Sequence, residues 1–92
     1  MKSLLYNCFI NRKICVNNYD NAIELITPYY KKYQYWYIVC ENEDETYDVY
    51  EIERTEDFLE EVLNNAEKLI WYEKYDCNYE IFVEGYVIKK GE

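Results

Sequence analysis

Residues 33–53, YQYWYIVCENEDETYDVYEIE, contain the aromatic centre of the chain and predict its central hairpin. Apolar and aromatic side chains occupy both faces of residues 33–40, a pattern typical of a central strand that is covered on two sides. Residues 47–53 alternate apolar and polar side chains, so they predict a partner strand, with residues 41–45 as the hairpin loop. Asp48, Glu51 and Glu53 should not all be buried, and we therefore expect the partner strand near an edge of the sheet.

The same region carries the net charge of the chain. Residues 41–61 hold eleven of the nineteen acidic residues and one basic residue, Arg54, which gives this segment a net charge of −10. The rest of the chain sums to +1, and the whole chain to −9. This segregation indicates an acidic surface that meets a basic partner, although a solvated face that keeps the protein soluble would carry the same charge.

We expect the acids of the loop, the partner strand and the next helix to form one negative surface. Aromatic side chains between them would supply the anchors of an interface. The candidate partner-binding residues are Glu41, Glu43, Asp44, Glu45, Asp48, Tyr50, Glu51, Glu53, Glu56, Asp57, Glu60 and Glu61.

A helix is predicted directly after the acidic strand. Thr55 is a good N-cap, and the acids that follow it suit the positive end of a helix dipole. The pattern predicts a helix end near Trp71 or Tyr72, and then a last strand over residues 79–89 with a bulge at Gly85. The apolar stripe of this helix contains Phe58, Leu59, Val62, Leu63, Ala66, Leu69 and Ile70.

The N-terminal third predicts a hairpin followed by a short helix. Residues 4–10 and 14–16 are strand-like, and the polar residues 11–13 predict a turn between them. Asn18 or Asp20 would cap a helix that stops or kinks near Pro28. The resulting order ββαββαβ predicts one α+β domain, with an antiparallel sheet of about five strands and two helices packed on one face.

Composition excludes several classes of chemistry. The chain of 92 residues has no histidine, so His-based catalysis and His metal sites are excluded. Its four cysteines lack Cys-x-x-Cys spacing, which favours reduced, mostly buried thiols in a cytosolic protein. We expect no signal peptide and no membrane span. The acidic charge argues against direct binding to nucleic acid or anionic lipid.

Two site hypotheses remain weak. Asn42, Asp44, Thr46 and Glu53 have the spacing of a calcium-binding EF-hand loop, but Tyr47 stands where the sharp turn needs glycine. A hydrolase with two carboxylates as acid and base is the second hypothesis. Because the chain has many acids, the presence of such a pair does not indicate this activity. We therefore predict no catalytic residue, no metal ligand and no cofactor.

In size, acidity and the segment 41–61, the chain resembles the small inhibitors that bacteriophages and mobile elements encode, namely anti-CRISPR and anti-restriction proteins. The likeness is one of kind, and no family residue is carried over. It implies a non-enzymatic inhibitor in the host cytoplasm, a monomer or dimer. As a nucleic-acid mimic, it would block a basic surface of a CRISPR effector or nuclease. The alternatives are an immunity protein or antitoxin that masks a basic nuclease toxin, and a small metal-binding domain or enzyme.

Overall fold

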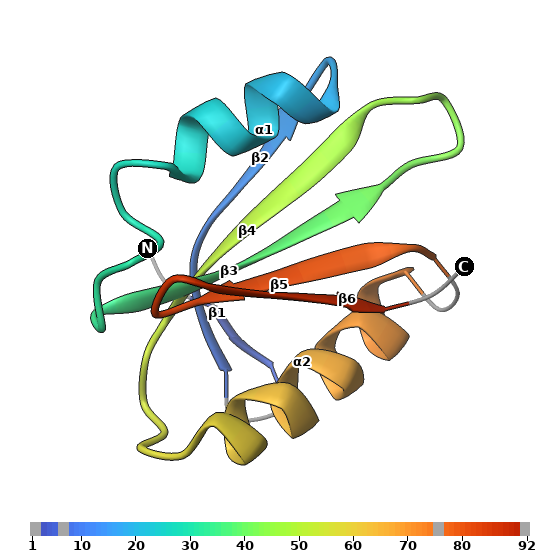
Figure 1. Cartoon of the computed structure of the whole chain (residues 1–92). Coiled ribbons are helices and arrows are strands. Elements are labelled where there is room, and N and C mark those ends of the chain that lie inside the picture. Colours follow the sequence, from blue (N-terminus) through green and yellow to red (C-terminus); the bar gives the residue numbers. More distant parts are fainter. Residues whose placement is uncertain (1–2, 6–7, 75–76, 91–92) are drawn as a thin grey trace.

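A six-stranded antiparallel sheet runs through the molecule, with one helix on each side of it (Figure 1). The computed structural model describes residues 3–5, 8–74 and 77–90. Along the chain the elements are β1 (Ser3–Leu5), β2 (Cys8–Val16), α1 (Tyr19–Ile26), β3 (Tyr35–Glu41), β4 (Tyr47–Glu53), α2 (Leu59–Lys74), β5 (Tyr79–Val83) and β6 (Tyr86–Lys90). The predicted α+β class, with an antiparallel sheet and two helices, is confirmed.

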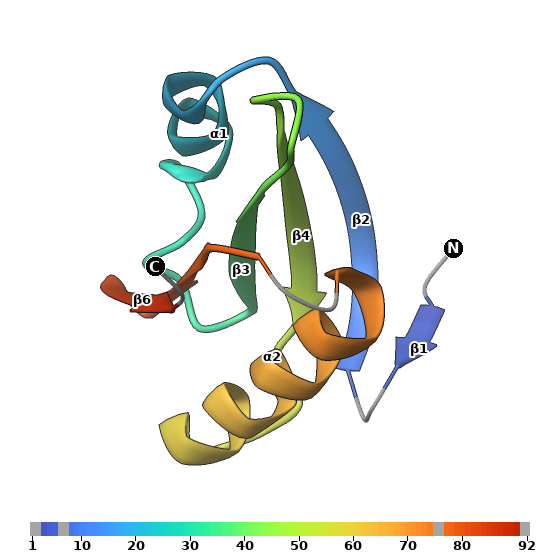
Figure 2. The ribbon, with the colours of Figure 1, turned by 90° about the vertical axis from the view of Figure 1, so that its right-hand side faces the viewer.

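The central hairpin predicted from residues 33–53 is formed by β3 and β4. Their register pairs Val39 with Val49 and Trp36 with Ile52. The prediction of an edge position for β4 is wrong, because the strand order is β1-β2-β4-β3-β5-β6. Figure 2 shows β4 between β2 and β3, with β1 and β6 at the two margins.

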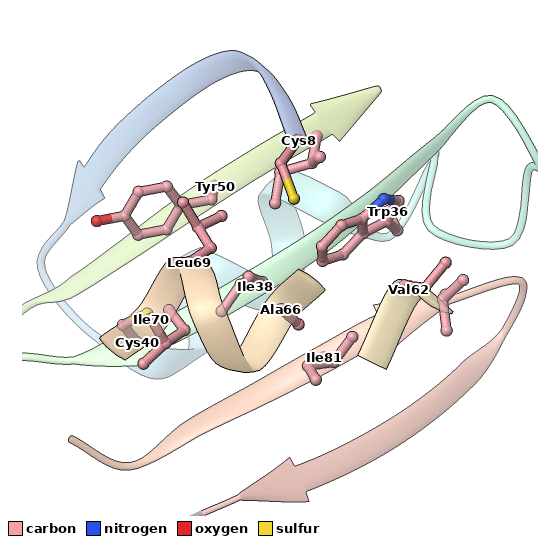
Figure 3. Close-up of a cluster of buried hydrophobic side chains, with 12 residues drawn as sticks. Cys8, Trp36, Ile38, Cys40, Tyr50, Val62, Ala66, Leu69, Ile70 and Ile81 are labelled. Atoms are coloured by element: carbon pink, nitrogen blue, oxygen red, sulfur yellow. The ribbon is translucent and has the colours of Figure 1, made fainter. Parts of the chain in front are cut away.

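The two helices cover opposite faces of the sheet, which corrects the prediction of a single covered face. Below the sheet in Figure 1, α2 packs against Trp36, Ile38 and Cys40 of β3, and Figure 3 shows this cluster. On the other face, α1 packs against Tyr37 and Val39 of the same strand. Since both faces of β3 are apolar, each needs a cover, and one layer of helices could not supply both.

The N-terminal hairpin differs from the prediction in the place of its turn. Residues 11–13 do not turn the chain but lie inside β2, where the register against β4 shifts between Ile10 and Arg12. β1 pairs with β2 so that Leu5 is opposite Cys8, and residues 6–7 of the predicted strand lie outside the described part. The helix prediction is confirmed, since the Asn18 side chain accepts a hydrogen bond from the Asn21 N–H and α1 ends before Pro28.

The C-terminal half departs from the prediction in α2 and in the last predicted strand. Thr55 does not cap α2, which begins at Leu59 and continues to Lys74. Phe58, predicted in the apolar stripe, is 70% exposed. Residues 79–89 form two strands instead of one bulged strand, because Glu84 (φ 50°) and Gly85 (φ 87°) make a two-residue turn between β5 and β6. Positive φ at both central residues is the geometry that a tight hairpin with right-handed strand twist requires.

Candidate binding surface

Four exposed acids stand at the tip of the β3–β4 hairpin. We call Glu41, Glu43, Asp44 and Glu45 the tip group, and all four are exposed. The Asp44 carboxylate accepts hydrogen bonds from the Thr46 hydroxyl (2.6 Å) and the Thr46 N–H (3.1 Å), and these bonds lower the pKa of Asp44. Backbone hydrogen bonds from Asn42 to Thr46 (2.9 Å) and from Glu45 to Asn42 (3.1 Å) close the turn. The tip therefore presents its carboxylates on an ordered frame.

An open concavity of about 550 Å³ lies beside the tip. Its lining residues are Glu41, Asn42, Glu43, Glu45, Lys74, Cys77 and Asn78. Lys74 is the one basic residue in that lining, and its ammonium donates to Asn42 Oδ1 (2.7 Å) and to the Asp48 carboxylate. Because this cation is already paired, it leaves the tip group strongly negative.

Asp48 and Glu51 do not belong to the surface, although both were predicted there. Asp48 is 6% exposed and pairs with Lys74 of α2, with the Lys13 ammonium at 3.8 Å. Burial by itself would raise the pKa of Asp48, but the hydrogen bond and charge of Lys74 outweigh it and hold that pKa below its ordinary value. This carboxylate therefore joins helix to sheet.

Glu51 is bound in the same way on the other face of β4. It is 7% exposed and accepts hydrogen bonds from Arg12 Nε (3.0 Å), Asn11 Nδ2 (2.6 Å) and the Tyr37 hydroxyl (2.9 Å). Burial opposes ionisation, yet these donors lower the pKa of Glu51. Two acids of the predicted surface thus stabilise the fold, because basic and polar partners from distant segments reach them.

Tyr50 and Glu56 are also buried, so the structure removes them from the predicted surface. Tyr50 is 0% exposed and donates a hydrogen bond to Glu73 (3.1 Å). Glu56 is 9% exposed, and its Oε1 accepts a hydrogen bond from Asn65 of α2. Glu53, at the last position of β4, is half-buried. None of the three extends the tip group.

The remaining predicted acids form a second exposed group at the other end of β4. We call Asp57, Glu60 and Glu61 the helix group, and all three are exposed at the start of α2. Figure 1 shows the β3–β4 loop and the beginning of α2 at opposite ends of the sheet. With ~3.3 Å per residue, β4 separates the two groups by roughly 20 Å. The expectation of one continuous negative surface is therefore wrong.

Exposed aromatic residues lie at both ends of α2, and their exposure was not predicted from the sequence. Phe58 is 70%, Trp71 60% and Tyr72 59% exposed, and all three flank or belong to α2. Glu67 is exposed on the same helix. Helical spacing could have identified this outer face, because Trp71 lies opposite the buried side that Leu69 and Ile70 occupy.

The segment before α2 is held by Arg54. Its guanidinium donates to Glu84 Oε2 (2.7 Å) and to the carbonyl oxygens of Glu56 (2.6 Å) and Asp57 (3.3 Å). It also lies 4.4 Å from the centre of the Tyr33 ring, and the Tyr33 hydroxyl donates to Asp57 Oδ1 (3.0 Å). The one base of the acidic segment is thus buried, and it positions the helix group without neutralising it at the surface.

The geometry does not support the calcium loop. Asn42, Asp44 and Thr46 lie in the hairpin turn, whereas Glu53 lies at the far end of β4, so the four side chains do not converge. Across residues 3–5, 8–74 and 77–90, no group of three or more Cys, Asp or Glu side chains is placed to hold a metal ion. Within these same ranges, no helix is both long and apolar enough to cross a membrane.

Comparison with known proteins identifies no relative: no family model, curated protein or solved structure matches the chain. Its function is therefore inferred from its own residues and their geometry.

Proposed function

We propose that this chain is a non-enzymatic inhibitor that binds a basic, nucleic-acid-binding surface of another protein. A CRISPR effector or another defence nuclease in the cytoplasm of a host cell is the target class that fits best. The observation that carries the proposal is the tip group, four exposed carboxylates on an ordered turn beside a lysine that is already paired.

The distribution of ion pairs supports this proposal. Among the described residues, Arg12, Lys13, Arg54, Lys74 and Lys89 pair with carboxylates, and they are half of the ten basic residues of the chain. Four of these pairs use Asp48, Glu51 or Glu84, and none uses the tip group or the helix group. The bases thus stabilise the fold, while the exposed acids keep a negative field that attracts a basic surface and speeds association.

The spacing of the exposed acids suggests what they imitate. One strand of a duplex carries a phosphate every ~3.4 Å, or about six over 20 Å. The tip and helix groups offer seven carboxylates over a similar length, gathered at its two ends. We therefore expect contacts with two basic patches of the target, each of which would otherwise hold part of one nucleic-acid backbone.

Affinity capture with matched variants tests the proposal. E43Q/E45Q removes two exposed acids of the tip group and leaves Asp44, which holds the turn, unchanged. D20N/E24Q removes two exposed acids of α1 and changes the net charge equally. Tagged wild type and both variants are incubated with purified CRISPR effectors, restriction nucleases and nuclease toxins, after free nucleic acid has been digested.

The expected result is that wild type and D20N/E24Q retain a basic defence nuclease, while E43Q/E45Q retains much less of it at low salt. Retention of a nuclease toxin instead would identify an immunity protein or antitoxin, and would replace the target class proposed here. Equal retention by all three chains would place the interface away from the hairpin tip.

A further inference from the structure

Two cysteines meet beneath the hairpin tip. Cys40 of β3 is paired with Tyr79 of β5, and the Glu41 N–H donates to the Asn78 carbonyl (3.0 Å) just beyond. Side chains alternate along a strand, so Cys77 follows the same face as Tyr79 and lies diagonally across from Cys40. In agreement with this register, Cys77 packs against the core cluster that contains Cys40.

The two thiols interact, and a cation lies next to them. Hydrogen bonding with Cys77, together with burial, raises the pKa of Cys40 strongly. The Lys74 ammonium is close enough to both thiols for its charge to act on them. The same ammonium pairs with the Asp48 carboxylate, whose charge acts on Cys40 in the opposite direction.

Solvent access distinguishes the two sulfurs. Cys77 is half-buried and lines the open concavity beside the tip. Cys40 is 0% exposed and lies behind it in the core. A small oxidant in the concavity therefore reaches Cys77 first, and Cys40 is held as the second thiol.

We propose that Cys40 and Cys77 are a peroxide-sensitive thiol pair that closes into an intramolecular disulfide. The Cys77 thiolate attacks one oxygen of hydrogen peroxide, the O–O bond breaks, and the leaving hydroxide takes up a proton to form water. Cys77 is then a sulfenic acid. The Cys40 sulfur attacks the Cys77 sulfur, the S–O bond breaks, and the hydroxyl leaves as water with the proton of Cys40. Two thiols thus supply two electrons, which reduce one peroxide to two waters.

The disulfide would tie the end of β3 to the segment that leads into β5. Because the closed loop contains β4 and α2, the bond restricts the unfolded chain, and the oxidised protein should melt roughly 10 °C or more above the reduced one. A dithiol reductant should reverse the change, as expected for a thiol–disulfide couple. No binding partner is needed, so the inference goes beyond the proposed function and stands apart from it.

Thiol counting tests the inference directly. The reduced chain is treated with stoichiometric hydrogen peroxide, unfolded, labelled with N-ethylmaleimide, and weighed by mass spectrometry. Of the four cysteines, wild type should take two labels instead of four, with peptide mapping joining Cys40 to Cys77. C15S, which removes an exposed thiol elsewhere, should still form the disulfide and take one label. C77S should form none and take three.

A second variant tests the order of the steps. In C40S the Cys77 sulfenic acid has no resolving thiol, so it should persist and be trapped by dimedone. Because Cys40 is fully buried, C40S can fail to fold, and in that event the comparison of wild type with C77S and C15S decides. Four labels on peroxide-treated wild type, or a disulfide that contains Cys8 or Cys15, would overturn the proposal.

Discussion

Lys74, the last residue of α2, donates a hydrogen bond to the carboxylate of Asp48, which is 6% exposed on the central strand β4. The contact joins the helix to the sheet inside the most acidic segment of the chain. The acids of that segment therefore have two different roles. Buried acids such as Asp48 stabilise the fold, and only the exposed acids are accessible to a binding partner.

Replacing Lys74 should therefore destabilise the protein far more than replacing another lysine of the same helix. K74M leaves the Asp48 carboxylate buried with Lys13 at 3.8 Å as its remaining cation, and should cost about 2–3 kcal/mol of unfolding free energy. K68M removes an exposed lysine and should change it by less than about 0.5 kcal/mol. Urea denaturation measures both, and equal stabilities of the two variants would refute the structural role of the Lys74–Asp48 pair.

Stability should fall as the solution becomes acidic. Folding lowers the pKa values of Asp48 and Glu51 from their ordinary values of 3.8 and 4.5. A lowered pKa contributes stability that is fully present above the ordinary value and is lost as pH falls through the folded-state value. The loss should therefore begin near pH 4.5 and continue below it. Urea midpoints measured across this range should fall less steeply for E51Q than for wild type, whereas E24Q, on the exposed side of α1, should follow wild type.

The two predicted helix caps should respond differently to alanine. Asn18 accepts a hydrogen bond from the Asn21 N–H (2.8 Å), so N18A should lose about 1 kcal/mol of unfolding free energy. Thr55 is exposed and lies four residues before the start of α2, so T55A should change stability by less than about 0.5 kcal/mol. A larger loss in T55A than in N18A would contradict the observed start of α2.

Local sequence patterns were sufficient to predict those helices and strands whose ends are set by neighbouring residues. The β3–β4 hairpin follows from alternating side chains around polar residues 41–45, and α1 follows from its Asn18 cap and Pro28. The turn at Glu84 was harder to predict, since glutamate rarely adopts positive φ. The two apolar faces of β3 indicate that each face is covered by a helix. The prediction that both helices pack on one face did not take this pattern into account.

Long-range contacts determine which acids are buried and where α2 begins. Glu51 is buried because Arg12, 39 residues away, pairs with it, and Asp48 because Lys74, 26 residues away, reaches it. Sequence spacing does not reveal such partners. The late start of α2 has a similar cause, since Arg54 binds the carbonyl oxygens of Glu56 and Asp57 and holds them outside the helix. The sequence therefore predicted that the candidate surface is acidic, but it identified only some of the residues that form this surface.

The most direct test of the central claim is displacement of nucleic acid from the captured target. A labelled nucleic acid is bound to the purified effector or nuclease, and each chain is titrated while fluorescence anisotropy reports release. We predict that wild type and D20N/E24Q release the label at similar concentrations, and that E43Q/E45Q needs roughly tenfold more at about 0.1 M salt. The difference should shrink toward 1 M salt, where screening acts over ~3 Å instead of ~10 Å. Equal release by E43Q/E45Q and wild type at low salt, or binding of wild type without release, would contradict the account.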